Sequence, residues 1–360
     1  MKTFFAGDIS PTRITRPLFK EKATATLFTD AASLFDGNDY NIVNLECALT
    51  DSENAIDKIG PALKGPAETA EVLKQLNVHC CNLSNNHTFD FGIEGITDML
   101  AALDAQGIDH TGFGSDYEDS RKNYILQKDN EKVAVIAVCE HEYTYALENR
   151  MGARPYDEYD TMEDIRKAKA ENHRVIVIYH GGKEYCRYPS PRLRKLCRAM
   201  VKNGADVVLC QHSHCIGCYE MFENGHILYG QGNFHFVEPS KRECWLSGLG
   251  VKYDTLSHEI EFIPLNMLEE GIEIAKGETA EKIMSDFSKR NAQLENGEWK
   301  KEWEAFCRES AETYKTAVSR AFAPEATERE KQMFPHYFDC EAHSDVLREI
   351  YKTYNHTNCI

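Results

Sequence analysis

The sequence predicts an α/β fold in which helices pack on a largely parallel β-core, followed by a helical extension. Short apolar runs alternate with amphipathic helical patterns through the first two-thirds of the 360 residues. A hairpin pattern follows near residue 250, and the remainder is charged and helix-like. Alternating strands and helices are typical of layered α/β proteins. We therefore expect an α/β domain at residues 1–265 and a charged helical extension at residues 266–360.

The predicted strands are short apolar runs bounded by polar or glycine positions, a pattern typical of buried strands. In chain order they cover residues 3–6, 41–45, 79–83, 132–139, 174–179, 207–211 and 227–229. Two further runs, at residues 250–253 and 259–264, predict an antiparallel hairpin.

The predicted helices carry apolar residues at intervals of three and four positions. The ranges with this spacing are 66–76, 93–103 and 190–203. Gly204 stands where a helix C-terminal cap belongs. Helical spacing recurs in the extension at Trp299, Trp303 and Phe306, so we expect this segment to pack as helices on the main domain.

Composition and charge exclude several classes of protein. Apolar residues make up 42% and charged residues 28% of the chain, and the formal net charge is −17. Such a charge repels nucleic acid and anionic membrane surfaces. No run approaches the roughly 20 apolar residues of a membrane span, and the segment before Asp8 is shorter than the apolar region of a signal peptide. We therefore expect a cytoplasmic protein with no membrane span and no nucleic-acid partner.

The chain has 13 cysteines, which we expect to be buried reduced thiols. Cys215 and Cys218 have the C-x-x-C spacing of a zinc ligand pair. No second cysteine pair at zinc-finger spacing accompanies them, so packing is the favoured interpretation and a zinc site is the alternative.

Polar fragments with metal-binding side chains follow five of the predicted strands. These fragments are Gly7-Asp8-Ile9-Ser10, Asn44-Leu45-Glu46, the run from Ser84 to Asp90, His180-Gly181-Gly182 and Gln211-His212-Ser213-His214. Side chains at the carboxyl ends of strands reach the crevice in which α/β folds bind ligands.

The residue types in these fragments suit a metal centre. His212 and His214 can turn both imidazoles towards one point, and imidazole is the commonest metal ligand. Glu46 has two oxygens that can serve two cations, and His87 can act as a general acid oriented by Asp90. Each fragment alone is also typical of a turn, a strand end or a helix cap. The metal interpretation therefore depends on the occurrence of all five fragments in one chain.

The order and spacing of these motifs resemble those of a known family. The matching pieces are Gly7-Asp8, Asn44-Leu45-Glu46, Asn85-Asn86-His87-x-x-Asp90-x-Gly92, His180-x-Gly182-x-Glu184-Tyr185, Gly204-Ala205-Asp206 before His212-x-His214, and Gly232-Asn233-Phe234. Over about residues 1–265 the chain resembles the bacterial capsule-synthesis CapA family (poly-γ-glutamate capsule proteins), a branch of the calcineurin-like metallophosphoesterases. The resemblance implies a four-layer α/β/β/α metallophosphoesterase-like sandwich, here with a C-terminal helical extension.

The resemblance also implies a set of site residues. One ion would be held by Asp8, Glu46 and His214, and a second by Glu46, Asn86, His180 and His212. His87 and Asp90 would form the general acid pair, and the residues on the substrate side would be Lys183, Glu184 and Asn233. Phosphoesterases of this fold usually begin D-x-H, whereas Ser10 occupies the histidine position here.

The function implied is metal-dependent hydrolysis, with a phosphoester as the substrate bond and an amide bond as a variant. Carboxylate, amide and imidazole ligands favour one or two Mn, Fe or Zn ions, which would bind an anionic small-molecule or polymer substrate. Two alternatives stay open: a non-hydrolytic role in capsule or poly-γ-glutamate biosynthesis, and a structural protein with a degenerate site.

Overall fold

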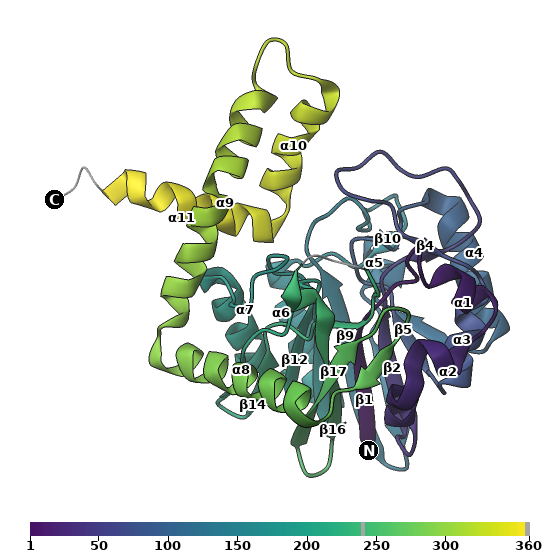
Figure 1. The fold of residues 1–360 in the computed structure, drawn as a ribbon. Coiled ribbons are helices and arrows are strands. Elements are labelled where there is room, and N and C mark those ends of the chain that lie inside the picture. The colour runs from purple at the N-terminus through teal and green to yellow at the C-terminus, as the bar shows by residue number, and fades with distance from the viewer. Residues whose placement is uncertain (239–241, 357–360) are drawn as a thin grey trace.

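The computed structural model describes residues 1–238 and 242–356, and it contains two β-sheets packed face to face with helices outside them (Figure 1). The first sheet has the order β18-β17-β16-β1-β2-β5-β6, and β15 also pairs with β1. Its strands are β1 Lys2–Ile9, β2 Tyr40–Leu45, β5 Cys80–Asn82, β6 Asp109–Thr111, β15 Asn233–His235, β16 Ser247–Asp254, β17 Glu259–Met267 and β18 Ile272–Ile274.

The second sheet has the order β13-β14-β12-β11-β9-β8. Its strands are β8 Tyr124–Lys128, β9 Glu131–Cys139, β11 Arg174–His180, β12 Val207–Gln211, β13 Tyr219–Phe222 and β14 Gly225–Leu228. Short strand pairs join β3 Ala48–Leu49 to β4 Lys64–Gly65 and β7 Phe113–Gly114 to β10 Gly152–Ala153. Strands β1, β2, β5 and β6 run parallel, as do β9, β11, β12 and β14.

Residue alternation along the strands explains the layers. In β9, Val133 and Val135 face the apolar cluster between the two sheets, while Ala134 and Ile136 face the cluster under the outer helices. Successive strand side chains point to opposite faces, so a strand that is apolar throughout is buried on both sides. The predicted α/β/β/α layering is therefore confirmed.

Helices cover the outer face of each sheet. Helices α1 Arg16–Lys20, α2 Thr24–Phe28, α3 Thr69–Gln75 and α4 Gly92–Ala105 belong to the first sheet's side, with the 3-10 helix Thr29–Phe35. Helices α6 Glu158–Glu171 and α7 Pro191–Lys202 belong to the second sheet's side, and α5 Tyr117–Ser120 and the 3-10 helix Glu243–Leu246 are short connections. Helix α7 begins where Ser190 accepts a hydrogen bond from the Leu193 backbone and Pro191 starts the first turn.

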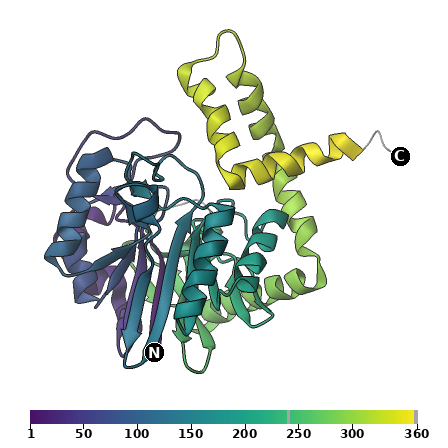
Figure 2. The ribbon, with the colours of Figure 1, turned by 180° about the vertical axis from the view of Figure 1, so that it is seen from behind.

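The C-terminal helices are α8 Gly277–Asn296, α9 Trp299–Ala321, α10 Glu328–Asp339 and α11 Glu341–His356. Figures 1 and 2 show α9 and α10 projecting beyond the α/β body. The apolar cluster shared by α9, α10 and α11 contains Trp303, Tyr314, Tyr337 and Val346, together with Cys186 of the main domain. Among the helices of the described ranges, none has the length and apolarity needed to cross a bilayer.

The strand and helix predictions agree with the observed elements, but two details differ. Strand β1 continues to Ile9, so Asp8 lies inside the strand rather than after it. Residue 265 falls inside β17, and β18 still belongs to the first sheet, so the sheet continues past the predicted domain boundary. We propose that the helical extension starts at Gly277; residues 357–360 of the predicted extension lie outside the described residues.

Cys215 and Cys218 are buried thiols. Their sulfurs donate to the backbone carbonyls of Cys186 and Arg187 at 3.3 Å and 3.5 Å. Within the described part of the chain neither belongs to a His/Cys/Asp/Glu group close enough to share an ion. The geometry therefore favours the packing interpretation over the zinc alternative.

Candidate metal centre

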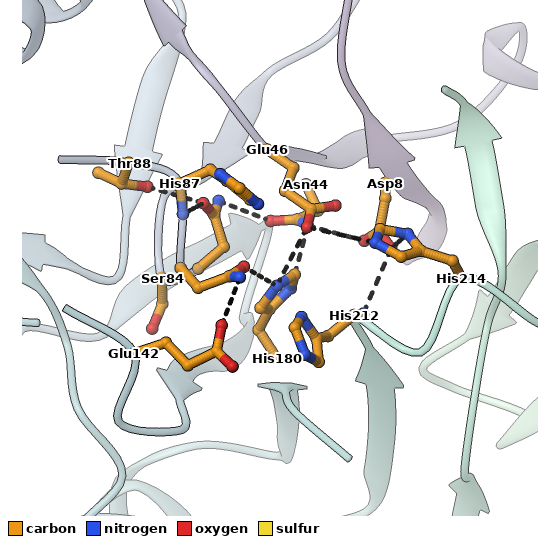
Figure 3. Close-up of polar contacts among 12 residues, drawn as sticks. Asp8, Asn44, Glu46, Ser84, His87, Thr88, Glu142, His180, His212 and His214 are labelled. Atoms are coloured by element: carbon orange, nitrogen blue, oxygen red, sulfur yellow. Dashed lines mark hydrogen bonds and ion pairs between the residues drawn. The ribbon is translucent and has the colours of Figure 1, made fainter. Parts of the chain in front are cut away.

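The carboxyl ends of parallel strands from both sheets bring the candidate ligands together (Figure 3). Asp8 lies opposite Asn44 in the β1–β2 register, and Glu46 follows directly after β2. His180 ends β11, and the segment that carries His212 and His214 follows β12. All of these side chains are buried.

The first cluster consists of Asp8, Glu46 and His214, whose ligand atoms lie within 4.8 Å of one another. His214 Nδ1 is 3.4 Å from Asp8 Oδ2, and His214 Nε2 is 3.9 Å from Glu46 Oε1. Ser10, at the position where a histidine was expected from related enzymes, is not part of the cluster. His214 is therefore the imidazole of this site.

The second cluster consists of Glu46, His180 and His212, again within 4.8 Å. His180 Nε2 lies 3.5 Å from Glu46 Oε1 and 3.0 Å from the amide oxygen of Asn86. Glu46 is thus common to both clusters. The structure brings together all six of the predicted ligands in the two groups that the motif resemblance implied, and we propose them as the ligands of two ions.

Glu46 provides the test of whether this site suits a cation. Both of its carboxylate oxygens are buried and have no hydrogen-bond partner among the described residues. Burial, followed by the neighbouring charge of Asp8, raises the pKa of Glu46 well above its ordinary value. An unpaired carboxylate is costly inside a protein, and a cation between Glu46 and the imidazoles would supply the missing positive charge. The donor set therefore fits a divalent metal.

The pKa values of Asp8, His214 and His180 are also shifted, because these buried groups lie close together. Burial opposes ionisation of Asp8, but its hydrogen bond to His214 and the charge of His180 outweigh burial and lower the pKa of Asp8. Burial also opposes protonation of His214, yet Glu46 and Asp8 raise its pKa to about 9. Burial lowers the pKa of His180 to about 4. Without an ion, His214 is the positive charge that Asp8 and Glu46 share.

Asn44 links the two clusters and was not identified as a site residue from the sequence. Its amide nitrogen donates to Asp8 Oδ1 at 2.8 Å and lies 3.2 Å from His180 Nδ1. Its oxygen accepts from the amide groups of Asn82 and Asn85. Such outer hydrogen bonds hold metal ligands in position. The sequence signals were its place at the end of a largely apolar strand and its position in the Asn44-Leu45-Glu46 motif.

Asn233 has a different position from the one predicted. Its amide oxygen lies 2.9 Å from His214 Nδ1, and its amide nitrogen donates to the Trp245 backbone carbonyl at 3.3 Å. Because the side chain is 1% exposed and both ends of the amide have protein partners, the arrangement does not agree with direct substrate contact. We propose that Asn233 orients His214.

The histidine segment has an unusual backbone. His212 and His214 have φ values of +87° and +53°, in the region that favours glycine. A non-glycine residue there costs about 1 kcal/mol or more. This sharp turn, directly after β12, points both imidazoles into the centre.

The predicted pair of His87 and Asp90 is present, with a third member that the sequence did not reveal. His87 Nδ1 lies 2.6 Å from Asp90 Oδ2, and Lys58 Nζ lies 2.5 Å from Asp90 Oδ1. Burial, and then the charge of Lys58, lower the pKa of His87 to about 4. The lowered pKa favours a neutral His87 at pH 7, and both Asp90 Oδ2 and, at 3.3 Å, Lys58 Nζ face its Nδ1.

Lys183 and Glu184 follow β11 and are only partly buried. Burial opposes ionisation of Glu184, but the charges of Lys183, His212 and His214 outweigh it and lower the pKa of Glu184. Lys183 also acts on Glu142, whose pKa is lowered against burial by His212, His343 and His336. These charges lie near the metal centre, and we propose that Lys183 and Glu184 face the substrate.

Comparisons with known proteins agree with the motifs. The family model described as bacterial capsule synthesis protein PGA_cap matches residues 2–238. The PGA biosynthesis protein CapA of Bacillus subtilis strain 168 is 31% identical over 237 residues, which are 64% of this chain and 62% of that protein. The capsule biosynthesis protein CapA of Bacillus anthracis is 30% identical over 277 residues, 73% of this chain and 66% of that protein. The chain thus spans a little under two-thirds of these relatives.

Solved structures give weaker similarity. A hypothetical protein of Thermus thermophilus is 12% identical with a TM-score of 0.47, covering 74% of this chain and 100% of that one. A dimetal phosphatase from Danio rerio is 10% identical with a TM-score of 0.35, covering 64% of this chain and 96% of that one. The classification of the chain depends on the sequence matches and on the geometry above.

Proposed function

This chain belongs to the PGA_cap family of bacterial capsule synthesis proteins, and from that premise we propose that it is a metal-dependent hydrolase acting on a phosphoester. The observation that carries the proposal is Glu46, a buried carboxylate with two unpartnered oxygens that belongs to both ligand clusters. A protein that used this site only for packing would pair those oxygens with hydrogen-bond donors.

Two divalent ions would be held by the protein groups already described. Asp8, Glu46 and His214 would hold one, and Glu46, Asn86, His180 and His212 the other. Ions of the Mn, Fe or Zn type in such a site lower the pKa of water and polarise an ester oxygen. The protein provides orientation: Asn44 holds Asp8 and His180, and Asn233 holds His214.

The residues beside the clusters would handle the substrate and a proton. Asp90 and Lys58 both contact Nδ1 of His87, so Nε2 is the ring nitrogen that we propose takes part in proton transfer with a reacting group. The ammonium group of Lys183 has no hydrogen-bond or ion-pair partner among the described residues, and we propose that it attracts an anionic substrate. His87 would then be the proton-transfer residue and Lys183 the substrate-binding residue.

The names of the relatives favour a second candidate. The Bacillus proteins are named for capsule and PGA biosynthesis, and a site of this kind could act on an amide bond of a polyglutamate chain or bind the polymer without cleaving it. The net charge of −17 opposes binding of a long polyanion, so we rank phosphoester hydrolysis first.

A metal-reconstitution assay separates these functions. Chelator-treated protein is reloaded with Mn²⁺ or Zn²⁺ and assayed with p-nitrophenyl phosphate, bis-p-nitrophenyl phosphate and a γ-linked glutamate oligomer. We expect metal-dependent release of nitrophenol that falls about 100-fold or more in His214→Ala. His226→Ala is the matched control. His226 lies in β14 and is also buried, but its ring nitrogens contact the Tyr219 hydroxyl and the His258 backbone carbonyl.

Each outcome of this assay distinguishes between the candidate functions. Turnover in the wild type and in His226→Ala, but not in His214→Ala, supports the phosphoesterase. Cleavage of the glutamate oligomer without phosphoester turnover supports the amide-directed alternative. Metal binding without any hydrolysis contradicts the hydrolase proposal.

A further inference from the structure

A third cluster of metal-binding side chains lies where the helical extension meets the α/β body. Glu142 follows β9, Cys340 separates α10 from α11, and His343 is in the first turn of α11. Their ligand atoms lie within 4.8 Å of one another. Cys340 and His343 lie outside residues 2–238, which the family model matches. We propose that these three residues bind a further divalent cation of the zinc type.

The donor set distinguishes this site from the two clusters of the metal centre. It combines a thiolate, an imidazole and a carboxylate, whereas the other clusters contain no sulfur. Thiolate and imidazole ligands select zinc over harder ions such as Mg²⁺ and Mn²⁺. Cys340 is 1% exposed. The site would therefore hold zinc even where the other clusters hold Mn or Fe.

Outer contacts orient all three ligands. Tyr314 Oη lies 2.6 Å from His343 Nδ1, which leaves Nε2 facing Glu142 Oε1 at 3.9 Å. The other oxygen of Glu142 accepts a 2.6 Å hydrogen bond from the amide nitrogen of Asn86. The Ser344 backbone N–H donates to the Cys340 backbone carbonyl at 2.9 Å, which holds the turn that carries the sulfur. A metal-binding histidine usually has such a partner on its other ring nitrogen, so Tyr314 is the outer partner this site requires.

Both sides of the cluster are held in place by contacts that need no ion. The His141 backbone donates to Glu341 at 2.9 Å, and the Ala342 backbone donates to Glu140 at 3.1 Å. Tyr145 donates to Asp339 at 2.9 Å. A preorganised site loses little entropy when it binds its ion.

An ion bound at this site would also affect the packing of the helical extension on the α/β body. An ion there would join α10 and α11 to the segment after β9. Because Glu142 also holds the amide of Asn86, the ion would fix Asn86 with its oxygen towards His180. The inference goes beyond the hydrolase proposal and does not depend on it, because no residue of the new site is a ligand in the other two clusters.

Cobalt substitution tests the proposal on the full chain. Chelator-treated protein is reloaded with Co²⁺, metal equivalents are counted by mass spectrometry, and the near-ultraviolet spectrum is recorded for thiolate-to-cobalt charge transfer. We expect this band in the wild type, and we expect Cys340→Ser to lose it together with one metal equivalent. Cys307→Ser is the matched control, because Cys307 in α9 is as buried as Cys340 but lies outside the site.

Two further samples keep the test decisive. His343→Gln should lose one equivalent, and zinc-loaded wild type should show a Zn–S distance of about 2.3 Å by X-ray absorption. Glu46→Gln should keep the thiolate band, which separates this site from the proposed hydrolytic centre. A wild type without a thiolate band or Zn–S distance, or a Cys340→Ser variant with undiminished stoichiometry, would overturn the proposal.

Discussion

Lys58 and Asp90 form a buried ion pair, with Nζ 2.5 Å from Oδ1 and side chains that are 5% and 0% exposed. The second Asp90 oxygen accepts the Leu63 backbone N–H and contacts His87. The pair therefore joins the irregular segment after β3 to the loop that carries Asn86 and His87.

Removal of the lysine charge should destabilise the protein. Lys58→Met leaves Asp90 charged and without its ion-pair partner, so we expect the free energy of unfolding to fall by about 3–5 kcal/mol. Denaturant unfolding measures this. Addition of Asp90→Asn should recover most of the loss. Lys22→Met is the control, since the Lys22–Glu71 pair is 38% exposed on both sides and should contribute less than about 1 kcal/mol.

Glu46→Gln should change stability in opposite directions with and without metal. In metal-free protein the substitution removes a buried carboxyl group that accepts no hydrogen bond and whose ionisation is opposed by burial and by Asp8, so we expect a gain of about 1–2 kcal/mol. The rise in melting temperature on addition of Mn²⁺ or Zn²⁺ should largely disappear. Thermal scans with chelator and with each ion provide the measurement. A variant that keeps the full metal-induced rise would show that Glu46 is not a ligand.

Asn233→Ala should weaken metal binding rather than substrate binding. Loss of the acceptor on His214 Nδ1 is expected to reduce the affinity of the first ion about 10–100-fold. Calorimetric titration of the apo-protein measures it, and Asn233→Asp, which keeps the acceptor, should bind more tightly than Asn233→Ala. An unchanged metal affinity with a raised KM would instead support the substrate contact expected from the sequence.

The acid limit of stability should depend on Glu220, which belongs to none of the candidate ligand clusters. Burial opposes its ionisation, but hydrogen bonds from Arg198 and Arg194 outweigh burial and lower its pKa to about 2. A lowered pKa stabilises the fold above the ordinary value of 4.5, and this contribution is lost as pH falls from there towards about 2.

Glu220→Gln isolates that contribution. The carboxylate is 13% exposed, so solvent screening reduces its effect to about 1–2 kcal/mol at pH 7. Unfolding free energies at pH 7 and at pH 3 provide the check: the difference between the variant and the wild type should be clearly smaller at pH 3 than at pH 7, because part of the contribution is lost before the pH reaches the folded-state pKa of about 2. An equal difference at both values would assign the effect to packing.

The proposed metal ligands could be found in the sequence because their signals are local. His180 and Glu46 follow apolar runs, and the parallel arrangement of those runs brings their ends to one edge. The expected family was confirmed by the match over residues 2–238. Asp8 inside β1 shows the limit of this reasoning, since a strand continues as long as its neighbours supply hydrogen bonds, which no local pattern reveals.

Residues without a local signal were missed for a physical reason. Lys58 lies in a segment with no helix or strand between β3 and β4, and Glu142 lies in a loop whose partners Asn86 and His343 are distant in the sequence. Their roles arise from tertiary contacts, as does the packing of α11 against the segment after β9. Single-sequence periodicity carries no information on such contacts.

At His212 and His214 the positive φ angles place backbone stability in conflict with the proposed metal binding. Glycine or asparagine at either position would relieve the backbone and stabilise the metal-free chain, yet each replacement removes an imidazole. A lineage selected only for a robust fold would therefore drift away from these histidines. A descendant that keeps both histidines would show selection for metal chemistry. A descendant that has lost them would show that the fold has acquired another function.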